Sequence, residues 1–239
     1  MRLWTVGFAV LAVLATASQS LGVVNVTAVV SADNHYGLFY GGADGTGLTF
    51  VGRNEIGPAG SSGLYNWTYP ETWGFSLDST QYLWVVAWDD VNTNSGGRSW
   101  GGVFSDTTSG SQLLDTNTRD WFSKLGGANP GDYGDVPAIS EIQSYGAGGT
   151  WSAPAVAGPP GAGVRDYFPP DWIWHDAPWS TVSEGHYVLF RTVNPIGSYP
   201  SPSDGNGGAI PEPATLLVWA GLGAMGLVAA WRRRRRQAA

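Results

Sequence analysis

An uninterrupted apolar run near the end of the chain, residues 214–231, most constrains how this sequence can fold. It holds 18 residues without a charge. As a helix it would be about 27 Å long, close to the thickness of a bilayer's hydrocarbon core. Five arginines follow it directly: Arg232, Arg233, Arg234, Arg235 and Arg236. Because positive charge beside a membrane helix stays in the cytoplasm, we expect a single membrane span with the preceding chain outside the cytoplasm.

Two prolines stand just before this run, in Pro211-Glu212-Pro213. Proline lacks a backbone N–H and drives the preceding residue into extended conformations, so an extended segment is predicted just outside the bilayer. The order of Pro-Glu-Pro, apolar helix and terminal arginines resembles the PEP-CTERM sorting signal of Gram-negative envelope proteins. The resemblance covers residues 209–239 and implies processing by an exosortase embedded in the inner membrane. The alternative is a single-pass helix that permanently anchors a structural protein.

The N-terminus has the layout of a secretory signal peptide. Arg2 is followed by an apolar run over residues 3–15, and the small residues Ala15 and Ala17 form an A-x-A-like cleavage site. We therefore expect residues 1–20 to be a signal peptide. The run is short for a retained membrane helix, so both ends of the chain predict export.

Between the two ends, the sequence predicts one β-sandwich domain over residues 21–193. A linker rich in proline, glycine and serine follows at residues 194–209, and the sorting signal occupies residues 210–236. The chain has no cysteine, so packing rather than disulfides must stabilise the domain.

The charge of the exported region is strongly acidic. Six of the twelve basic residues lie between Arg2 and Arg232, as do all nineteen acidic residues, which gives this region a formal charge of −13. This balance argues against nucleic acid or anionic lipid as a partner, because both need a basic surface. Divalent cations and neutral sugars remain compatible with it.

Strand patterns dominate the domain and predict an all-β fold. Residues 35–40 alternate and lead through a glycine-rich turn to residues 47–51, which indicates a hairpin. Residues 82–88 are apolar on both faces, so this strand is predicted to be central in its sheet. Residues 100–104 are expected to pair with it, and residues 172–174 and 186–193 read as later strands.

Two segments depart from this pattern. Residues 111–126 carry Leu113, Leu114, Trp121, Phe122 and Leu125, a spacing that favours a short helix with Asn117 or Thr118 as its N-cap. Residues 126–170 are rich in small residues and proline, and we expect surface loops around one or two short strands, with residues 138–145 the most regular part.

The order of these segments resembles the galactose-binding-like jelly-roll domains of exported bacterial proteins. The resemblance rests on residues 30–42 (VSADNHYGLFYGG), on Trp73, and on residues 82–90, 101–104, 172–174 and 188–191. Gly41-Gly42 stands where Asn-Gly is usual in that family. The resemblance implies a single jelly roll.

Tryptophans in loop-like sequence are the candidate sugar-binding residues. Aromatic faces stack on sugar rings while neighbouring polar groups fix the orientation. Trp67, Trp151 and Trp179 lie outside the predicted strands and are the candidates. By contrast, Trp84, Trp88, Trp100 and Trp172 lie within strands and are expected in the core.

Carboxylates at strand ends are the candidate metal ligands. Asp89, Asp90 and Asp106 offer oxygen atoms of the kind that Ca²⁺ takes from loops. The spacing of a dedicated calcium loop is absent, and the alternative is that these residues are solvated turn carboxylates that bond local amides. No other cofactor is expected.

Catalytic patterns are sparse. No spacing selects a pair of carboxylates, no G-x-S-x-G turn occurs, and His175 and Asp176 are merely adjacent. We therefore expect a non-catalytic protein of the envelope or extracellular matrix that contacts polysaccharide. The alternative is an envelope hydrolase acting on glycans, which would need two facing carboxyl groups in a cleft.

Overall fold

The computed structural model describes residues 22–54, 70–89, 98–131, 135–157, 171–176 and 185–199. The expected signal peptide, the Pro-Glu-Pro segment, the apolar run with its arginines, and Trp67, Asp90 and Trp179 lie outside these residues. In the described part of the chain, no helix combines the length and apolarity that a membrane crossing requires.

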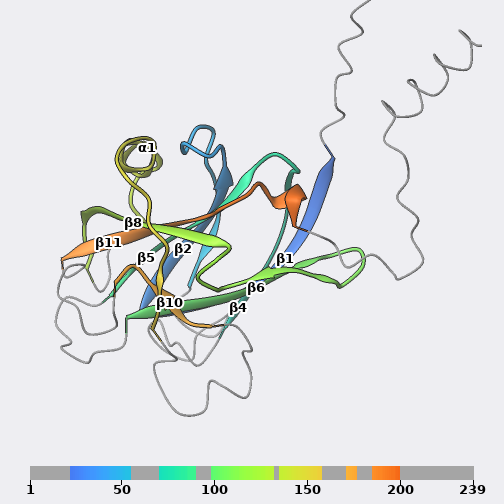
Figure 1. Ribbon diagram of the computed structural model, residues 1–239, viewed down its shortest axis with the longest axis horizontal. Helices are drawn as coiled ribbons and strands as arrows, with labels where there is room; N and C mark the ends of the chain where they lie inside the picture. Colours follow the sequence, from blue (N-terminus) through green and yellow to red (C-terminus); the bar gives the residue numbers. More distant parts are fainter. Residues whose placement is uncertain are drawn as a thin grey trace, which may run out of the picture. The chain divides into compact units, whose positions relative to one another are not determined.

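Two antiparallel sheets make up the domain (Figure 1). The six-stranded sheet has the order β4 (Glu71–Asp78), β1 (Val23–Asp33), β6 (Ser99–Asp106), β10 (Ile173–Trp174) and β9 (Ala155–Val156). Its sixth strand, β7 (Gln112–Asp115), also pairs with β6. The five-stranded sheet has the order β3 (Thr49–Arg53), β2 (His35–Gly41), β5 (Tyr82–Trp88), β11 (His186–Thr192) and β8 (Trp121–Ala128). The predicted all-β, two-sheet architecture is confirmed.

The chain passes repeatedly between the sheets, so neighbours in sequence are often not partners. β1 leads into β2 through Asn34 alone, and the turn at residues 79–81 carries the chain from β4 to β5. The expected pairing of residues 100–104 with residues 82–88 is therefore wrong. β6 pairs with β1 and β7, whereas both edges of β5 are taken by β2 and β11.

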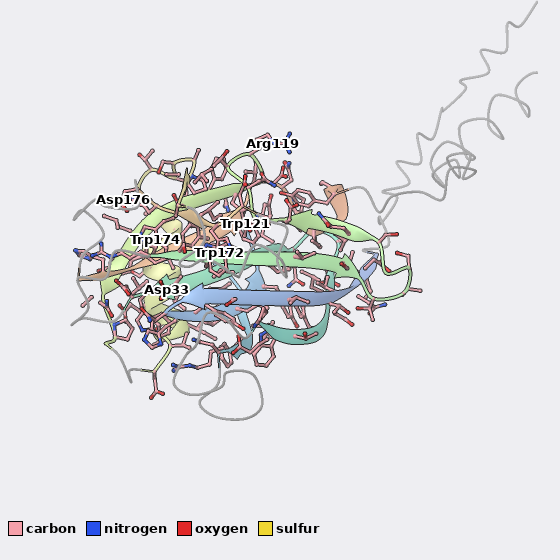
Figure 2. The ribbon with its side chains drawn as sticks, turned by 90° about the horizontal axis from the view of Figure 1, so that it is seen from below. Asp33, Arg119, Trp121, Trp172, Trp174 and Asp176 are labelled. Atoms are coloured by element: carbon pink, nitrogen blue, oxygen red, sulfur yellow. The ribbon has the colours of Figure 1, made fainter. Side chains whose placement is uncertain are left out.

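The main core fills the space between the sheets. Alternate residues of β1 and β5 point inward, including Val26, Val30 and Val85, which have no exposed surface. Aromatic rings occupy its middle: the Trp100 and Trp121 centroids lie 4.8 Å apart at 86°. Figure 2 shows Trp121 within the body of the domain. Edge-to-face contacts of this kind add to the area that the rings bury.

A second apolar layer lies on the outer face of the five-stranded sheet. The helix α1 (Ile139–Ala147) covers this face (Figure 1), and its Ile142 is fully buried beside Trp84 and Leu189. Since α1 covers one face of β5 and the other sheet covers its second face, β5 is buried on both sides. The prediction of a central strand at residues 82–88 is confirmed.

The expected helix over residues 111–126 is wrong, since this segment forms β7 and β8. Trp121, Ser123 and Leu125 of β8 point inward at every second position. Phe122 is apolar on the opposite face, so the sequence does not show the alternation of a strand. Asn117 caps a turn instead of a helix: its Oδ1 accepts bonds from the backbone N–H groups of Arg119 (2.9 Å) and Asp120 (2.8 Å). The helix lies instead at residues 139–147, where we expected loops and short strands.

Residues 194–199, which we expected to begin the linker, pack on the sandwich. Ile196 is fully buried, and its N–H donates to the Gln81 carbonyl at 2.8 Å. The hydroxyl of Tyr199 donates to the Asp120 carbonyl at 3.1 Å. The ordered domain therefore continues at least to Tyr199.

Candidate functional site: an aromatic and cationic patch

A row of five side chains runs across the outer face of the five-stranded sheet. Residues directly opposite each other in antiparallel strands share a face. The register pairs Phe39 with Phe50 and with Trp84, and it pairs Arg191 with Trp84 and with Phe122. The row therefore reads Phe50, Phe39, Trp84, Arg191, Phe122 from β3 to β8. Four strand spacings make it about 19 Å long.

The middle of this row is covered and its two ends are open. Phe39 and Trp84 are buried, because α1 and the loop after β2 lie over them, and the Trp84 indole donates to the Gly42 carbonyl at 3.1 Å. Phe50 is 46% exposed at one end. At the other end Arg191 and Phe122 are half-buried. Solvent therefore reaches a cation next to an aromatic ring.

Four aromatic rings surround the Arg191 guanidinium. Its central carbon lies 5.0 Å from the Trp151 centroid, 5.2 Å from that of Tyr82, 5.7 Å from that of Phe122 and 5.9 Å from that of Trp84. One guanidinium nitrogen, Nη1, donates to the Ala43 carbonyl. Cation–π contacts of this number hold a long side chain in place at the surface. We call this set, together with Lys124, the Arg191 patch.

Trp151 reaches the patch from the segment after α1. Gly149, with φ of +69°, turns the chain, and the backbone of Ser152 then pairs with that of Ser123 on the free edge of β8 at 2.7 and 3.0 Å. The indole meets Trp84 edge-on, with centroids 5.4 Å apart at 76°. Of the three tryptophans predicted to bind sugar, Trp151 alone is described, and it is half-buried.

Lys124 supplies a second cation in the next row of side chains. Its Nζ lies 5.7 Å from the Trp151 centroid and donates to the Tyr145 carbonyl. Partial burial lowers the pKa of both Lys124 and Arg191, because desolvation penalises their charged forms. The nearby Asp44 is engaged elsewhere: its Oδ1 accepts bonds from the Thr46 hydroxyl and N–H at 2.7 and 3.0 Å, which lower the pKa of that carboxyl.

Asp89 and Asp106, the two predicted metal ligands that the structure describes, do not come together. Asp106 caps its own turn, because Oδ1 accepts bonds from the N–H groups of Thr108 and Ser109, both at 2.8 Å, which lower the pKa of its carboxyl. Asp89 pairs with Arg98 at 3.2 Å. Arg98 precedes β6 and Asp106 ends it, so about 25 Å of strand separates these sites. Across the described ranges, no three acidic or histidine side chains are grouped as metal ligands.

A serine and a histidine meet where the two sheets join. The Ser123 hydroxyl of β8 lies 3.0 Å from His175 Nδ1, just after β10. Burial lowers the pKa of His175, partly opposed by the charge of Asp176. Ser123 has no exposed surface, so its oxygen cannot reach a substrate in this conformation. The pair instead links one sheet to the other.

These observations define a class: a two-sheet β-sandwich domain with a partly exposed aromatic and cationic patch. Residues 209–235 match the PEP-CTERM protein-sorting motif. The chain thus carries a PEP-CTERM sorting motif, which implies export, sorting at the membrane and processing by an exosortase-type enzyme. Searches among curated proteins and among solved structures gave no match.

The sequence singled out Trp151 as a candidate but not the residues that surround it in the structure. Tyr82 and Phe122 belong to segments that we read as strand and helix, and Arg191 is a single charge inside a strand pattern. Only the register of β5, β11 and β8 brings these residues together. A lone arginine at an outward position of an otherwise apolar strand is the one signal that was available.

Proposed function

We propose that this protein is a non-catalytic component of the envelope or extracellular matrix that binds polysaccharide through the Arg191 patch. One observation carries the proposal: the half-buried rings of Tyr82, Phe122 and Trp151 surround the donor groups of Arg191 on one open part of the surface. Ring faces stack on the C–H faces of sugars, and N–H donors orient their hydroxyl groups.

The positions of Glu71, Glu141 and the buried Ser123 support a non-catalytic role. Glu71 lies between the sheets and accepts a bond from Tyr36 at 3.0 Å, while Glu141 lies on α1 and accepts one from Tyr187 at 3.2 Å. A glycosidase needs its two carboxyl groups about 5 to 10 Å apart across a cleft. Glu71 and Glu141 lie on opposite sides of the five-stranded sheet, so they do not form such a pair.

Delivery of the domain follows from its sorting motif. We propose that the helix at residues 214–231 spans the inner membrane during export, with Arg232 to Arg236 in the cytoplasm. Processing within residues 210–214 then frees the sandwich for the envelope or the medium. Ca²⁺ held by one of the strand-end carboxylates is a further part of the proposal, so binding is to be measured with and without this ion.

Retention of the mature protein in native gels that contain polysaccharide tests the binding. The Trp151→Ala variant should lose affinity by about tenfold or more, the usual effect of removing an aromatic anchor. Phe50→Ala is the matched control, because it removes an exposed ring at the far end of the same row. Equal retention of all three folded proteins, or retention of none by any neutral or acidic polysaccharide, would overturn the proposal.

A further inference from the structure

We infer that the Arg191 patch selects polysaccharides that carry carboxylate groups, such as polymers of uronic acids. This inference rests on the proposed function and narrows it to one chemical class of ligand. It is carried by two partly exposed cations that share an aromatic surface and that have no acidic partner in the described part of the chain.

Arg191 has donor groups left to offer. Its Nη1 donates to the Ala43 carbonyl, and its Nε is buried and therefore out of reach of a ligand. The N–H groups of the two terminal nitrogens that Ala43 does not take are the donors on offer. A guanidinium held against ring faces keeps its in-plane N–H groups for other acceptors, and their planar fork matches the two oxygens of a carboxylate. The aromatic rings therefore fix the arginine in a form that suits a carboxylate.

Lys124 places a second positive charge against the same indole. Both cations lie over the Trp151 ring, at 5.0 Å for Arg191 and 5.7 Å for Lys124. Asp44 is an acidic residue whose charge acts on Arg191, where it raises the pKa of the guanidinium, but its Oδ1 is bonded to Thr46. Two cations against one indole, with no acidic side chain bonded to them among the described residues, favour an anion from outside the chain.

The acidity of the whole domain does not cancel this preference. The exported region carries nineteen acidic residues and six basic ones. At physiological ionic strength, charges farther apart than about 8 Å are largely screened, so the nearest groups decide the local potential. The net negative charge of the domain therefore does not prevent a carboxylate from binding at the Arg191 patch.

Paired polymers that differ only in charge provide the test. The probes are polygalacturonate, alginate and hyaluronan, each compared with its carboxyl-reduced counterpart, against the mature protein. We expect the acidic forms to bind about tenfold more tightly than the reduced forms, as for a charge-assisted contact. The Arg191→Gln variant should lose this preference, and Lys124→Gln should reduce it several-fold. Arg119→Gln is the charge-matched control, because Arg119 is exposed at the periphery before β8 (Figure 2).

The outcomes separate this inference from the proposed function. Equal binding of acidic and reduced polymers would overturn carboxylate selection and leave polysaccharide binding standing. Binding of no polymer would overturn both. If Arg191→Gln does not fold, as judged by its thermal transition, Lys124→Gln decides, and an undiminished preference in that variant would overturn the inference. An equal loss in Arg119→Gln would do the same, because it would show that overall charge is sufficient.

Discussion

Tyr36 joins the two sheets through a single hydroxyl. Its oxygen donates to Glu71 Oε2 at 3.0 Å and accepts a bond from the Trp73 indole at 2.7 Å. Glu71 is only 5% exposed, so its carboxylate depends on bonds from the protein. In a domain without disulfides, this polar link fixes how β2 of one sheet packs against β4 of the other.

The Tyr36→Phe substitution should lower the free energy of unfolding by about 1 to 3 kcal/mol, because it takes a donor from a buried carboxylate. Denaturant titration measures the change. Tyr40→Phe is the matched control: Tyr40 points into the same space and stacks on Phe75 with centroids 5.7 Å apart. Equal stability of the two variants would contradict the role of the Tyr36 hydroxyl.

Residue types alone predicted part of the candidate site. Trp151 was chosen because it stands in loop-like sequence, and the structure places it half-buried at the surface. Arg191 was not chosen, because its role depends on cross-strand neighbours that no local spacing records. The rings that surround Arg191 are brought together by strand register, and register is a long-range property.

At the scale of elements, two glycines of β8 leave room for a tyrosine side chain of the neighbouring strand β11. The Tyr187 ring lies across Gly126 and Gly127, and a Cβ at Gly126 would stand 2.0 Å from a ring carbon. The register between β11 and β8 shifts at this point, between His186 and Val188. The close approach lets Tyr187 bond Glu141 of α1 at 3.2 Å, which ties the helix to the sheet.

We expect Gly126→Ala to destabilise the domain by about 1 to 3 kcal/mol, since the ring must move out of a packed layer. Gly74→Ala serves as the matched control in the edge strand β4, where a Cβ would meet nothing within 4 Å. That variant should be slightly more stable, by up to about 1 kcal/mol, because alanine is favoured over glycine in strands. Similar unfolding midpoints in urea for both variants would contradict this packing.

Elements with a strong period were predictable, and elements with mixed signals were not. Residues 82–88 are apolar at every position, so only a strand covered on both sides suits them. The helix at residues 139–147 (ISEIQSYGA) buries only Ile142 and Gly146, which leaves too short an apolar stripe to recognise. Partners such as β6 and β1 were not predictable because the chain changes sheets between neighbouring strands.

At the scale of the whole molecule, the Ser123–His175 pair links the two sheets and makes the stability of the domain sensitive to acid. Burial lowers the pKa of His175 in the folded state, while an unfolded histidine titrates near about 6.5. The unfolded chain therefore binds more protons in this range, and stability rises with pH. The contribution of His175 is complete above about pH 6.5 and is lost as the pH falls below it.

The free energy of unfolding should accordingly fall between about pH 7 and pH 5, and less steeply in the His175→Gln variant. Urea titrations at several pH values give both slopes. His186→Gln is the control, because His186 is exposed at the start of β11. Identical slopes for wild type and His175→Gln would show that the pair does not couple protonation to folding.

Under the proposed function, export and processing bring the sandwich to the place where its patch binds polysaccharide. The sorting motif covers residues 209–235, and the folded domain reaches Tyr199 before it. Cleavage after the domain would therefore leave the Arg191 patch intact, because every residue of the patch lies at or before Arg191. A chain that keeps its apolar run would instead remain an anchored structural protein.

The intact mass of the mature protein, taken from the native envelope and from the culture supernatant, tests the central claim most directly. The wild-type protein should lack the chain beyond the Pro211-Glu212-Pro213 segment, while a variant carrying Pro211→Ala and Pro213→Ala should retain it. Both masses should also show the loss of residues near 1–20. A full C-terminus in wild type and variant alike would contradict the account and would leave the apolar run as a permanent anchor.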